Sequence, residues 1–423
     1  MSVRAGIIVT GTEVLSGQIS DQNGPWVAAR LLELGVDVAH VTICGDRPGD
    51  MTQQLRFLTG QGLDLIVTTG GLGPTADDLT VPTVAAFCGL EVIRDPEVEE
   101  HITQIIRRWR RFADDHQLSD ALTAGIAKQA LVPAGAAAIP PTGTAPGVAI
   151  PASPTHPAIL ILPGPPRELR AMWPAALAQP AVAGVLAGAD DVVHETMRAY
   201  GLSEPDLAAT LRRAGEEIGG YDTLELTTCM RGGEVEIDAR FPRGAAAHYD
   251  ALKTLLLQEH SGQIFSPDGA TVDDLLARAL TGRTIATAES CTGGLVAARL
   301  TDRPGSSAYV LGGVVSYSND VKIRVLGVPA DLIAELGAVS EPVAAAMADG
   351  ARSVAGSDIA VSTTGIAGPG GQVPGKPVGT VCFGLAIDGR PTATVTRTFP
   401  GDRTMVRTLA TSYALHLVLG ALT

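Results

Sequence analysis

The chain has 423 residues, and its composition is 45% hydrophobic with 49 glycines and 28 prolines. A chain of this length exceeds what one hydrophobic core usually organises, so we expect two or three globular domains joined by tight connections. The formal net charge of -14 comes without a basic stripe, which argues against nucleic acid as a direct partner.

Cysteine usage and the chain ends predict a cytoplasmic protein without a membrane partner. The five cysteines are far apart and form no C-x-x-C pair, so neither a zinc site nor a disulfide framework is expected. The sequence MSVRAGIIVTG enters a strand-like run directly, without the pattern of a secretion signal. The apolar stretch 409–422 is interrupted by polar residues and is expected to be a buried helix, too short to cross a bilayer.

The first part of the chain, from Arg4 to about Trp173, alternates short apolar runs with helical patterns. This alternation predicts a mainly parallel sheet covered by helices. The expected strands are AGIIVTG, VDVAHVTICG, LDLIVTTGG and AILILPGPP, and residues 26–34 and 51–58 have the apolar spacing of core-facing helices. The Pro/Gly/Ala-rich stretch 132–157 is expected to be a long irregular excursion.

The motif TTGGLGPTADDLT, residues 68–80, follows an expected buried strand and precedes an expected helix. Gly70, Gly71 and Gly73 allow a ligand to approach the backbone closely, where free N–H groups suit phosphate oxygens. Asp77 and Asp78 add hard carboxylate oxygens of the kind that bind Mg²⁺. The alternative is a tight turn followed by aspartates that only cap the next helix.

Two further segments follow expected strands and strengthen the hypothesis of a ligand site. One is GTEVL with the later Asn23, and the other is PGPPRE. Ligands of open α/β sheets bind outside the carboxyl ends of the strands, so the three segments are expected to converge. The additional candidate ligand-binding residues are Glu13, Asn23, Pro163, Gly164, Pro165 and Glu168.

The middle of the chain, residues 180–266, changes character. Its patterns predict the order strand, helix, hairpin and helix, which is that of a small KH-like α+β module. The G-x-x-G clamp that grips nucleotides in such modules is missing, so a spacer or dimerisation role is favoured over nucleic-acid binding.

The last part of the chain returns to alternating strands and helices and predicts a third, α/β unit. The expected strands are TIATAES, GGVVSYS, DIAVSTTG, GTVCFGLAI and TATVTRTF. The final helix carries Val406, Leu409, Ala410, Tyr413 and Leu417 on one face and is expected to close the core.

The motif ATAESCTGG leads from one of these strands into a glycine-rich turn. Ser290, Thr292 and the N–H groups of Gly293 and Gly294 would face a phosphate or an oxyanion at the start of the next helix. The alternative is an ordinary helix cap.

Ser307, Tyr317 and Lys322 lie within sixteen residues with no histidine nearby. This set suggests a hydroxyl nucleophile activated by a lysine base that burial keeps neutral. Arg403 is a candidate neighbouring cation or phosphate ligand. The alternatives are a solvated surface lysine and an ordinary strand tyrosine.

The N-terminal motifs GTEVLSGQISDQN, TGGLGPTADD and PGPPRE resemble the molybdopterin-binding domain shared by molybdopterin adenylyltransferases and the CinA (competence/damage-inducible) family. The resemblance to CinA implies hydrolysis of ADP-ribose, or a related ADP-containing pyrophosphate, to AMP and a sugar phosphate. It also implies a divalent metal of the Mg, Mn or Co class at Asp77 and Asp78. Pterin binding or adenylyl transfer is the alternative for this half.

The C-terminal motifs AESCTGG, GSS, YSN with its later lysine, TGIAGP, KPVGTV and GDR resemble the PncC-type nicotinamide-mononucleotide deamidase. The resemblance implies release of ammonia from nicotinamide mononucleotide without a cofactor. It implies Ser307 as first choice for the nucleophile, Lys322 as base and Tyr317 as an orienting group, with Ser290 as runner-up.

The remaining site expectations concern oxyanion stabilisation and a rival nucleophile. Backbone N–H groups of GIAGPGG, which begins at Gly365, or of the two glycines in AESCTGG would form the oxyanion hole, with Thr364 beside them. A Cys291 thiolate is disfavoured because its motif contains no imidazole.

The sequence therefore predicts an α/β protein of three modules. These are a molybdopterin-binding-like three-layer α/β domain at 1–175, the KH-like module at 180–266 and an α/β amidase domain at 267–423. We expect small nucleotides as partners and a homodimer. A non-enzymatic role in competence or recombination is the remaining alternative.

Overall fold

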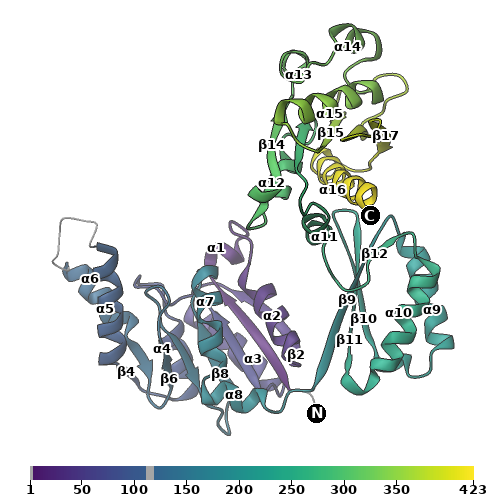
Figure 1. Cartoon of the computed structure of the whole chain (residues 1–423). Coiled ribbons are helices and arrows are strands. Elements are labelled where there is room, and N and C mark those ends of the chain that lie inside the picture. The colour runs from purple at the N-terminus through teal and green to yellow at the C-terminus, as the bar shows by residue number, and fades with distance from the viewer. Residues whose placement is uncertain (1–2, 111–118) are drawn as a thin grey trace. The chain divides into compact units, whose positions relative to one another are not determined.

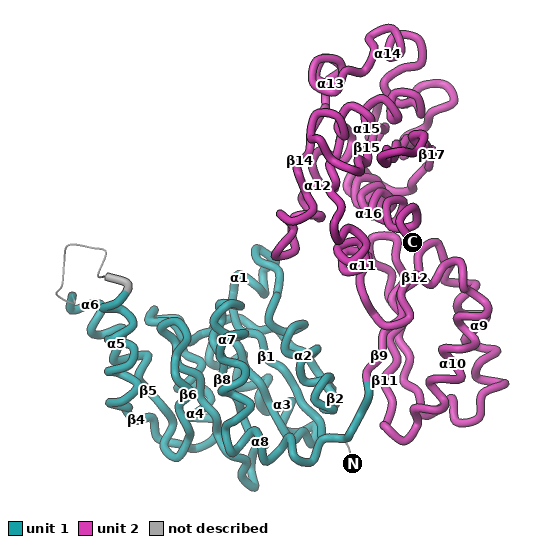
Figure 2. The backbone as a smooth tube through the Cα atoms, viewed as in Figure 1, with its two compact units in different colours: residues 1–193 teal, residues 194–423 magenta. Residues whose placement is uncertain are grey.

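The computed structural model describes residues 3–110 and 119–423. The chain divides into two compact units, residues 1–193 and 194–423, which are described separately (Figure 2). Met1 and Ser2, at the start of the first expected domain, lie outside the described residues. Residues 180–193 of the expected middle module belong to unit 1, whereas the rest of that module and the expected C-terminal domain fall in unit 2. The separation of these two as domains stays a prediction.

Unit 1 is built on a six-stranded sheet in the order β2-β1-β3-β8-β7-β6. Strands β2, β1, β3 and β8 are parallel, whereas β7 and β6 are antiparallel additions at one edge. The strands are β1 Arg4–Thr10, β2 Asp37–Cys44, β3 Leu65–Thr69, β6 Ala137–Ile139, β7 Gly147–Ile150 and β8 Ala158–Leu162. All four strands predicted from the sequence are confirmed. A separate antiparallel pair joins β4 Val92–Arg94 to β5 Leu131–Pro133.

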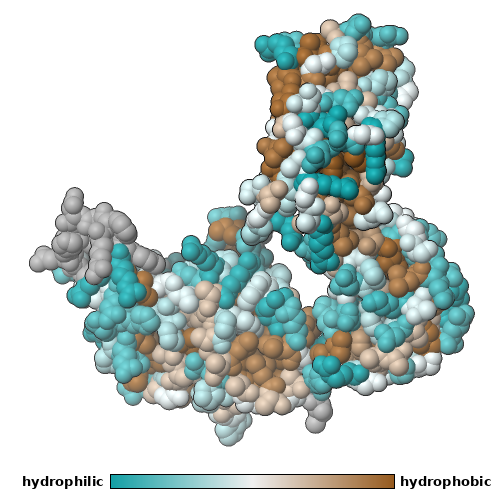
Figure 3. All heavy atoms as spheres, in the orientation of Figure 1, coloured by the Kyte–Doolittle hydropathy of each residue, from teal (hydrophilic) through white to brown (hydrophobic). Residues whose placement is uncertain are grey.

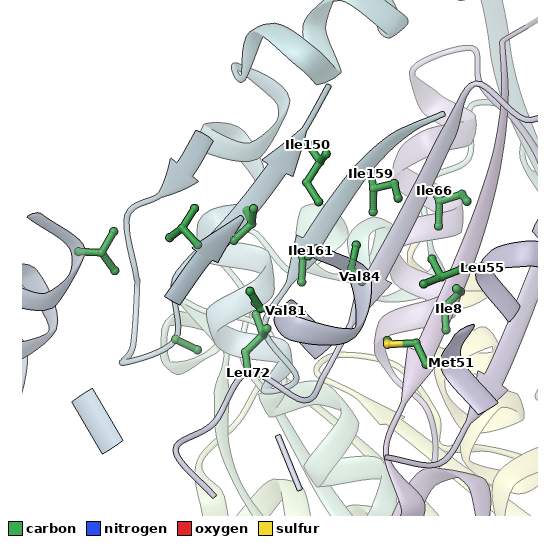
Figure 4. Packing of buried hydrophobic residues seen from close by; sticks show 14 of the residues in the cluster. Ile8, Met51, Leu55, Ile66, Leu72, Val81, Val84, Ile150, Ile159 and Ile161 are labelled. Atoms are coloured by element: carbon green, nitrogen blue, oxygen red, sulfur yellow. The ribbon is translucent and has the colours of Figure 1, made fainter. Parts of the chain in front are cut away.

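Helices cover both faces of this sheet (Figure 1). They are α1 Thr12–Leu15, α2 Asn23–Glu33, α3 Pro48–Gly60, α4 Thr80–Cys88, α5 Pro96–Arg110, α6 Asp120–Gln129, α7 Pro166–Leu177 and α8 Pro180–Leu186. Because successive strand residues point to opposite faces, the sheet supplies two separate cores. Ile8 and Ile66 face Leu55 of α3 and Val84 of α4, the core drawn in Figure 4. Alternate strand residues pack with α2, α7 and α8.

The stretch 132–157 is not irregular throughout, contrary to the expectation. It contributes most of β5 and all of β6 and β7, and β7 is fully buried. Each of these strands has only three or four residues, so no alternating hydropathy can develop along them. Backbone pairing of β7 with β8 and with β6 holds β6 and β7 in the six-stranded sheet, whereas β5 pairs with β4.

The first part of unit 2 has the element order that the sequence predicts, with one additional short strand. Its elements are β9 Val192–Tyr200, which begins in unit 1, α9 Glu204–Glu217, β10 Glu225–Arg231, β11 Glu234–Pro242, α10 Ala246–Glu259 and β12 Ile264–Ser266, with 3₁₀ turns η1 Tyr221–Thr223 and η2 Arg243–Ala245. They form a sheet in the order β10-β11-β9-β12. Gly232 and Gly233 form the hairpin turn with positive φ, a conformation that favours glycine.

The second part of unit 2 is a five-stranded sheet in the order β14-β13-β15-β16-β17. Strands β14, β13 and β15 are parallel, and β16 and β17 are antiparallel. The strands are β13 Ile285–Glu289, β14 Val310–Val315, β15 Ile359–Gly365, β16 Thr380–Ile387 and β17 Ala393–Thr398. The helices are α11 Val272–Ala279, α12 Leu295–Thr301, α13 Asn319–Leu326, α14 Ala330–Leu336, α15 Glu341–Ala355 and α16 Arg403–Leu422, with the 3₁₀ turn η3 Ser306–Ala308.

Helix α16 extends well before the apolar stretch 409–422, and among the described residues it alone is long and apolar enough to cross a membrane by length and composition. Val406, Ala410, Ala414 and Val418 are fully buried in a core with α11 and the sheet. This burial is that of a core helix, as the sequence predicted. Its most buried face is centred on Ala410 and Ala414, and Leu409 is only half-buried.

The hairpin of unit 2 contacts the end of α16. His416 lies 2.9 Å from the Glu234 carboxylate, and Tyr200 stacks on the imidazole with ring centroids 3.9 Å apart. All three side chains are shielded from solvent for most of their area. The middle segment therefore packs directly on the last helix of the C-terminal sheet.

Strand β14 lies at the edge of its sheet and exposes Leu311 and Val315. Figure 3 shows hydrophobic spheres at the margin of unit 2 where Figure 1 draws this strand. Apolar edge strands are common places of association between chains. The expected homodimer itself stays a prediction.

Candidate functional site

The three loops predicted to converge in unit 1 line one cavity of about 560 Å³. They follow β1, β3 and β8, and the loop after β2 joins them through Asp46. The cavity lies at the carboxyl edge of the parallel strands, as expected for an open α/β sheet. The predicted residues that line it are Glu13, Asn23, Gly70, Gly71, Gly73, Asp77, Asp78, Gly164, Pro165 and Glu168.

Two glycines of the β3 loop are required by close contacts. A Cβ atom on Gly70, whose φ is 107°, would lie 2.3 Å from the Thr10 carbonyl oxygen. A Cβ atom on Gly73 would lie 2.4 Å from Asp78 Oδ2. The glycines therefore allow the loop to fold against β1 and its own aspartates, which holds the backbone at the cavity wall.

Asp77 and Asp78 line the cavity and do not cap the next helix. Helix α4 has Leu79 as its N-cap, without a side-chain hydrogen bond. Asp78 Oδ2 accepts from the Thr75 backbone N–H at 2.9 Å, and the Thr75 hydroxyl lies within hydrogen-bond distance of both carboxylates. The hydrogen bond from Thr75 lowers the pKa of the Asp77 carboxyl, so this group stays ionised near neutral pH.

Asn23 and Pro163 take part in hydrogen bonds that connect the loops of the cavity. Buried Asn23 donates to the Thr69 hydroxyl at 2.9 Å and to the Gly164 carbonyl at 2.6 Å. The Pro163 carbonyl accepts from the same Thr69 hydroxyl at 2.9 Å, and Pro163 is not among the residues that line the cavity. Half-buried Glu168 keeps a carboxyl at the cavity wall, and burial raises its pKa.

The cavity is lined by six carboxylates and, among the described residues, by no lysine or arginine. The acidic residues are Glu13, Asp21, Asp46, Asp77, Asp78 and Glu168. A bound phosphate would therefore need a cation to offset the repulsion. Two aspartates suit a Mg²⁺-type ion, which is often held by one or two carboxylates together with substrate phosphates and water. Within residues 3–110 and 119–423, no three His, Cys, Asp or Glu side chains gather as a complete protein-only metal site.

In unit 2, the lysine predicted as base contacts Ser290. Lys322 Nζ lies 3.0 Å from Ser290 Oγ and donates to the Ser316 carbonyl at 2.7 Å. Ser290 follows β13, and Lys322 lies on α13 after the neighbouring strand β14. The carboxyl ends of two parallel strands therefore bring the serine and the lysine together.

Lys322 is only 1% exposed, so it is not the solvated lysine of the alternative interpretation. Burial lowers the pKa of its ammonium, although the nearby Cys291 opposes this shift. Burial of Cys291 raises the pKa of its thiol to about 12, so the thiol stays neutral and is a poor nucleophile.

Within the chain, the structure does not bring Ser307 beside Lys322. Ser307 is exposed in η3, immediately before β14, whereas Lys322 follows the carboxyl end of that strand. A six-residue strand spans about 20 Å, so Ser307 lies at the opposite end of the sheet. The runner-up, Ser290, occupies the position beside the lysine.

Tyr317 and Arg403 form a second group beside the Gly365–Gly371 loop. Tyr317 is 60% exposed, and its hydroxyl accepts from Arg403 Nη2 at 2.9 Å. Arg403 Nη1 donates to the Gly368 carbonyl at 3.0 Å. Exposure leaves this guanidinium accessible to an anionic ligand.

The expected oxyanion donors in the AESCTGG turn are already engaged. The Gly293 N–H donates to the Ser290 carbonyl at 3.2 Å, and the Gly294 N–H donates to Glu289 Oε2 at 2.8 Å. The buried Thr292 hydroxyl also contacts Glu289, at 2.7 Å. This turn is therefore held internally, which corrects the expectation that it binds phosphate or an oxyanion.

The other expected donors lie on the β15 side. The Thr364 hydroxyl donates to the Ala338 carbonyl at 2.7 Å and is 1% exposed. Gly365 is the last residue of β15, and a Cβ atom there would lie 2.7 Å from the Thr380 carbonyl oxygen. The Ile366 N–H donates to the Thr380 carbonyl at 2.8 Å, so the backbone from Ala367 to Gly371 is left as the candidate oxyanion hole.

The sequence interpretation missed three residues. Asp46 lines the cavity and accepts from the Thr12 backbone N–H at 2.8 Å. Glu289 and Arg407 hold the turn that carries Ser290. Asp46 follows an expected strand and could have been found from the rule that ligands bind at the carboxyl ends of strands. Glu289 and Arg407 can be recognised only from their tertiary contacts.

These features define a protein with two α/β parts, each with polar groups at the carboxyl edge of a parallel sheet. Residues 6–183 match the family model described as "Probable molybdopterin binding domain", and residues 270–422 match the "CinA C-terminal domain". A CinA-like protein of Mycobacterium sp. strain MCS is 57% identical, and the alignment covers 100% of this chain and 99% of the relative. The chain belongs to the CinA family.

A second relative agrees with this assignment. A CinA-like protein of Mycobacterium tuberculosis is 53% identical over 99% of this chain and 97% of its own length. The solved structure of a competence or damage-inducible protein from Enterobacter asburiae is 38% identical. It aligns with 37% of this chain and 100% of its own, with a TM-score of 0.35.

Proposed function

We propose that the C-terminal part of the chain hydrolyses the carboxamide of nicotinamide mononucleotide to nicotinic acid mononucleotide and ammonia. The single observation that carries this proposal is the buried contact between Ser290 Oγ and Lys322 Nζ. A serine beside a buried lysine whose pKa is lowered can be activated as a nucleophile without a histidine. The CinA family motifs supply the substrate class.

Ser290 Oγ attacks the carboxamide carbon while its proton passes to Lys322 Nζ. The tetrahedral intermediate collapses when that proton is given to the leaving nitrogen, which departs as ammonia. Water then cleaves the acyl ester and restores the Ser290 hydroxyl, with Lys322 again accepting a proton. Arg403 is the ligand for the substrate phosphate, and Tyr317 orients that guanidinium.

For the N-terminal part we propose hydrolysis of ADP-ribose, or a related ADP-containing pyrophosphate, to AMP and a sugar phosphate. The acidic cavity supports a reaction that needs a divalent cation between the aspartates and the pyrophosphate. When bound at Asp77 and Asp78, the cation shields phosphate charge and lowers the pKa of a water molecule. The Gly70 N–H is engaged with the Leu162 carbonyl, so the backbone of residues 71–73 is assigned to the phosphate end of the substrate.

A second candidate for this part is pterin binding, because residues 6–183 match a probable molybdopterin binding domain. Release of AMP from ADP-ribose distinguishes the two candidates, since a pterin-binding module would leave ADP-ribose intact. A cytoplasmic location and a homodimer stay predictions of the sequence.

Removal of metal is expected to separate the two activities. The protein is given ADP-ribose or nicotinamide mononucleotide in separate reactions, with and without EDTA, and AMP and ammonia are assayed. EDTA should stop AMP release, whereas ammonia release should continue because Ser290 and Lys322 need no metal. Metal-dependent ammonia release would contradict the proposed deamidase mechanism.

The deamidation rate is expected to fall as the pH is lowered through the pKa of Lys322. Burial lowers this pKa, so the neutral base persists to a lower pH than for an exposed lysine, and protonation below that pH abolishes its base function. The measurement is kcat/KM for ammonia release against pH. Lys322→Arg should be inactive throughout, because arginine stays protonated. An active Lys322→Arg protein would contradict the neutral-base mechanism.

A further inference from the structure

The turn that carries Ser290 is held by an acid that the proposed reaction does not use. Glu289 is the last residue of β13 and is 1% exposed, and its side chain accepts hydrogen bonds from the turn that follows. Its Oε2 accepts from the Thr292 hydroxyl at 2.7 Å, the Gly294 N–H at 2.8 Å and the Val296 N–H at 3.1 Å. Its Oε1 accepts from the Ala297 N–H at 2.8 Å and the Thr287 hydroxyl at 3.2 Å.

The carbonyl groups of the same turn are held from the other side by Arg407 on α16. Arg407 Nε donates to the Cys291 carbonyl at 3.1 Å, and its Nη2 donates to the Thr292 carbonyl at 2.9 Å. The Ser290 N–H itself donates to the Thr363 carbonyl at 2.8 Å. Two charged side chains therefore hold the backbone that follows Ser290, and the neighbouring strand β15 holds the Ser290 N–H.

This arrangement differs from an ordinary helix cap. Helix α12 has Gly294 as its N-cap, with a φ of 97° and no side-chain cap hydrogen bond. The residue that satisfies its first N–H groups lies five positions earlier, on the opposite side of Ser290 in the sequence. A carboxylate in this place couples the strand before the serine to the helix after it.

We propose that Glu289 and Arg407 are positioning residues that hold Ser290 Oγ within reach of Lys322 Nζ. This inference rests on the proposed role of Ser290 as nucleophile. Neither side chain is assigned to the substrate or to proton transfer. They act by fixing the amides and the carbonyls of the turn, so that the hydroxyl is already oriented when the substrate arrives.

Glu289→Gln tests the carboxylate with almost no change in size. Each oxygen of Glu289 accepts at least one backbone N–H and one hydroxyl. The amide NH₂ group of the glutamine is itself a donor. In either orientation of the amide it would therefore face a backbone N–H, which is also a donor. The turn must rearrange, and a displacement of about 1 Å at the nucleophile costs roughly 100-fold in rate.

Arg407→Lys tests the guanidinium. A lysine keeps the charge but offers one nitrogen, which cannot reproduce the two donors that Nε and Nη2 direct at successive carbonyls. We expect a loss of about 10-fold or more in kcat for this variant. In both variants KM should change by less than about 3-fold, because neither substitution removes a contact that binds the substrate in the ground state.

The matched control is Asp358→Asn. This carboxylate also accepts from backbone and hydroxyl, namely the Thr284 N–H at 2.7 Å and the Thr284 hydroxyl at 2.9 Å. It anchors the opposite, amino-terminal end of the same pair of strands, β13 and β15. Its loss reports how much a general weakening of the sheet changes the activity.

The experiment measures kcat and KM for ammonia release and, separately, labelling of Ser290 by a fluorophosphonate, followed by mass spectrometry. In the labelling step the Ser290 oxygen bonds to phosphorus, fluoride leaves and the hydroxyl proton passes to Lys322. The full-length proteins are compared at a temperature at which circular dichroism reports all of them folded. Labelling needs the positioned nucleophile but not the nucleotide substrate.

We expect Glu289→Gln to lower both kcat and the labelling rate by about 100-fold, while Asp358→Asn stays within about 3-fold of the unchanged protein. Equal labelling of Glu289→Gln and the unchanged protein would overturn the positioning role. An equal loss in Asp358→Asn and Glu289→Gln would also overturn it, because the effect would be general. Failure of the unchanged protein to label at Ser290, with ammonia still released, would instead refute Ser290 as the nucleophile.

Discussion

Ser290→Ala is expected to lower ammonia release from nicotinamide mononucleotide by about three orders of magnitude or more. Alanine removes the hydroxyl that forms the acyl ester, and nothing else in the site replaces it. The nearby Cys291 cannot substitute, because burial raises the pKa of its thiol to about 12. The measurement is kcat/KM for ammonia release, with AMP release from ADP-ribose as the internal control.

Lys322→Ala is expected to cause a loss of the same size, and the double variant should be scarcely worse than either single variant. A hydroxyl without its base is a poor nucleophile at neutral pH, and a base without its hydroxyl has nothing to activate. Members of one catalytic unit are therefore strongly non-additive. A fully active Lys322→Ala protein would eliminate the lysine-base mechanism.

Ser307→Ala is the matched control for these substitutions. Ser307 is an exposed serine in the same part of the chain, at the opposite end of β14 from Lys322. It should keep near-normal deamidation. Loss of activity in Ser307→Ala with an active Ser290→Ala protein would reverse the assignment of the nucleophile.

The longer strands could be predicted from the sequence because each is an uninterrupted run of mostly apolar residues. LIVTT of β3 and IATAE of β13 are buried along their whole length, as parallel strands covered on both faces should be. The short strands β6 and β7 could not be predicted in the same way. Three or four residues cannot display a period, and their pairing depends on β8, which follows them in the chain.

The choice between two serines depended on which end of a strand each one occupies. Ser307 is closer to Lys322 in the sequence and is the nucleophile that the family resemblance implies, but it precedes β14 and does not lie beside the lysine. Ser290 is thirty-two positions from the lysine, but both follow the carboxyl ends of neighbouring parallel strands. The strand-end argument that identified the N-terminal cavity would have selected Ser290 had it been applied to the second sheet.

Side chains that hold a site are harder to predict than those that line it. Glu289 and Arg407 are separated by more than one hundred positions, and both contact the same turn because α16 packs beside α12. Neither belongs to a spacing with its own chemical meaning. Their roles follow from hydrogen bonds to backbone atoms, which a sequence pattern does not record.

Asp77→Asn combined with Asp78→Asn is expected to lower AMP release from ADP-ribose by about 100-fold or more, with ammonia release unchanged. A carboxamide has the size of a carboxylate but not its charge, so the variant loses the anionic ligands that a divalent cation needs. A metal ion contributes several kcal/mol by stabilising charge in such reactions, which corresponds to at least this loss in rate. Because the aspartates do not cap α4, the substitution should disturb the Thr75 contacts within the loop but leave the helix intact.

The control for this substitution is Asp95→Asn, which removes a carboxylate from the same unit but outside the cavity. Asp95 Oδ1 accepts from the Glu97 N–H at 2.9 Å and from the Val98 N–H at 3.1 Å, so the control weakens the start of α5 without touching the cavity. Raising the concentration of Mg²⁺ or Mn²⁺ should restore part of the activity of the single variants, since one carboxylate remains, but not that of the double variant. Unchanged AMP release in the double variant would show that Asp77 and Asp78 are not the metal ligands. Equal loss of AMP and ammonia release would instead indicate that the substitution acts on the whole protein, because Ser290 and Lys322 belong to the other unit and use no metal.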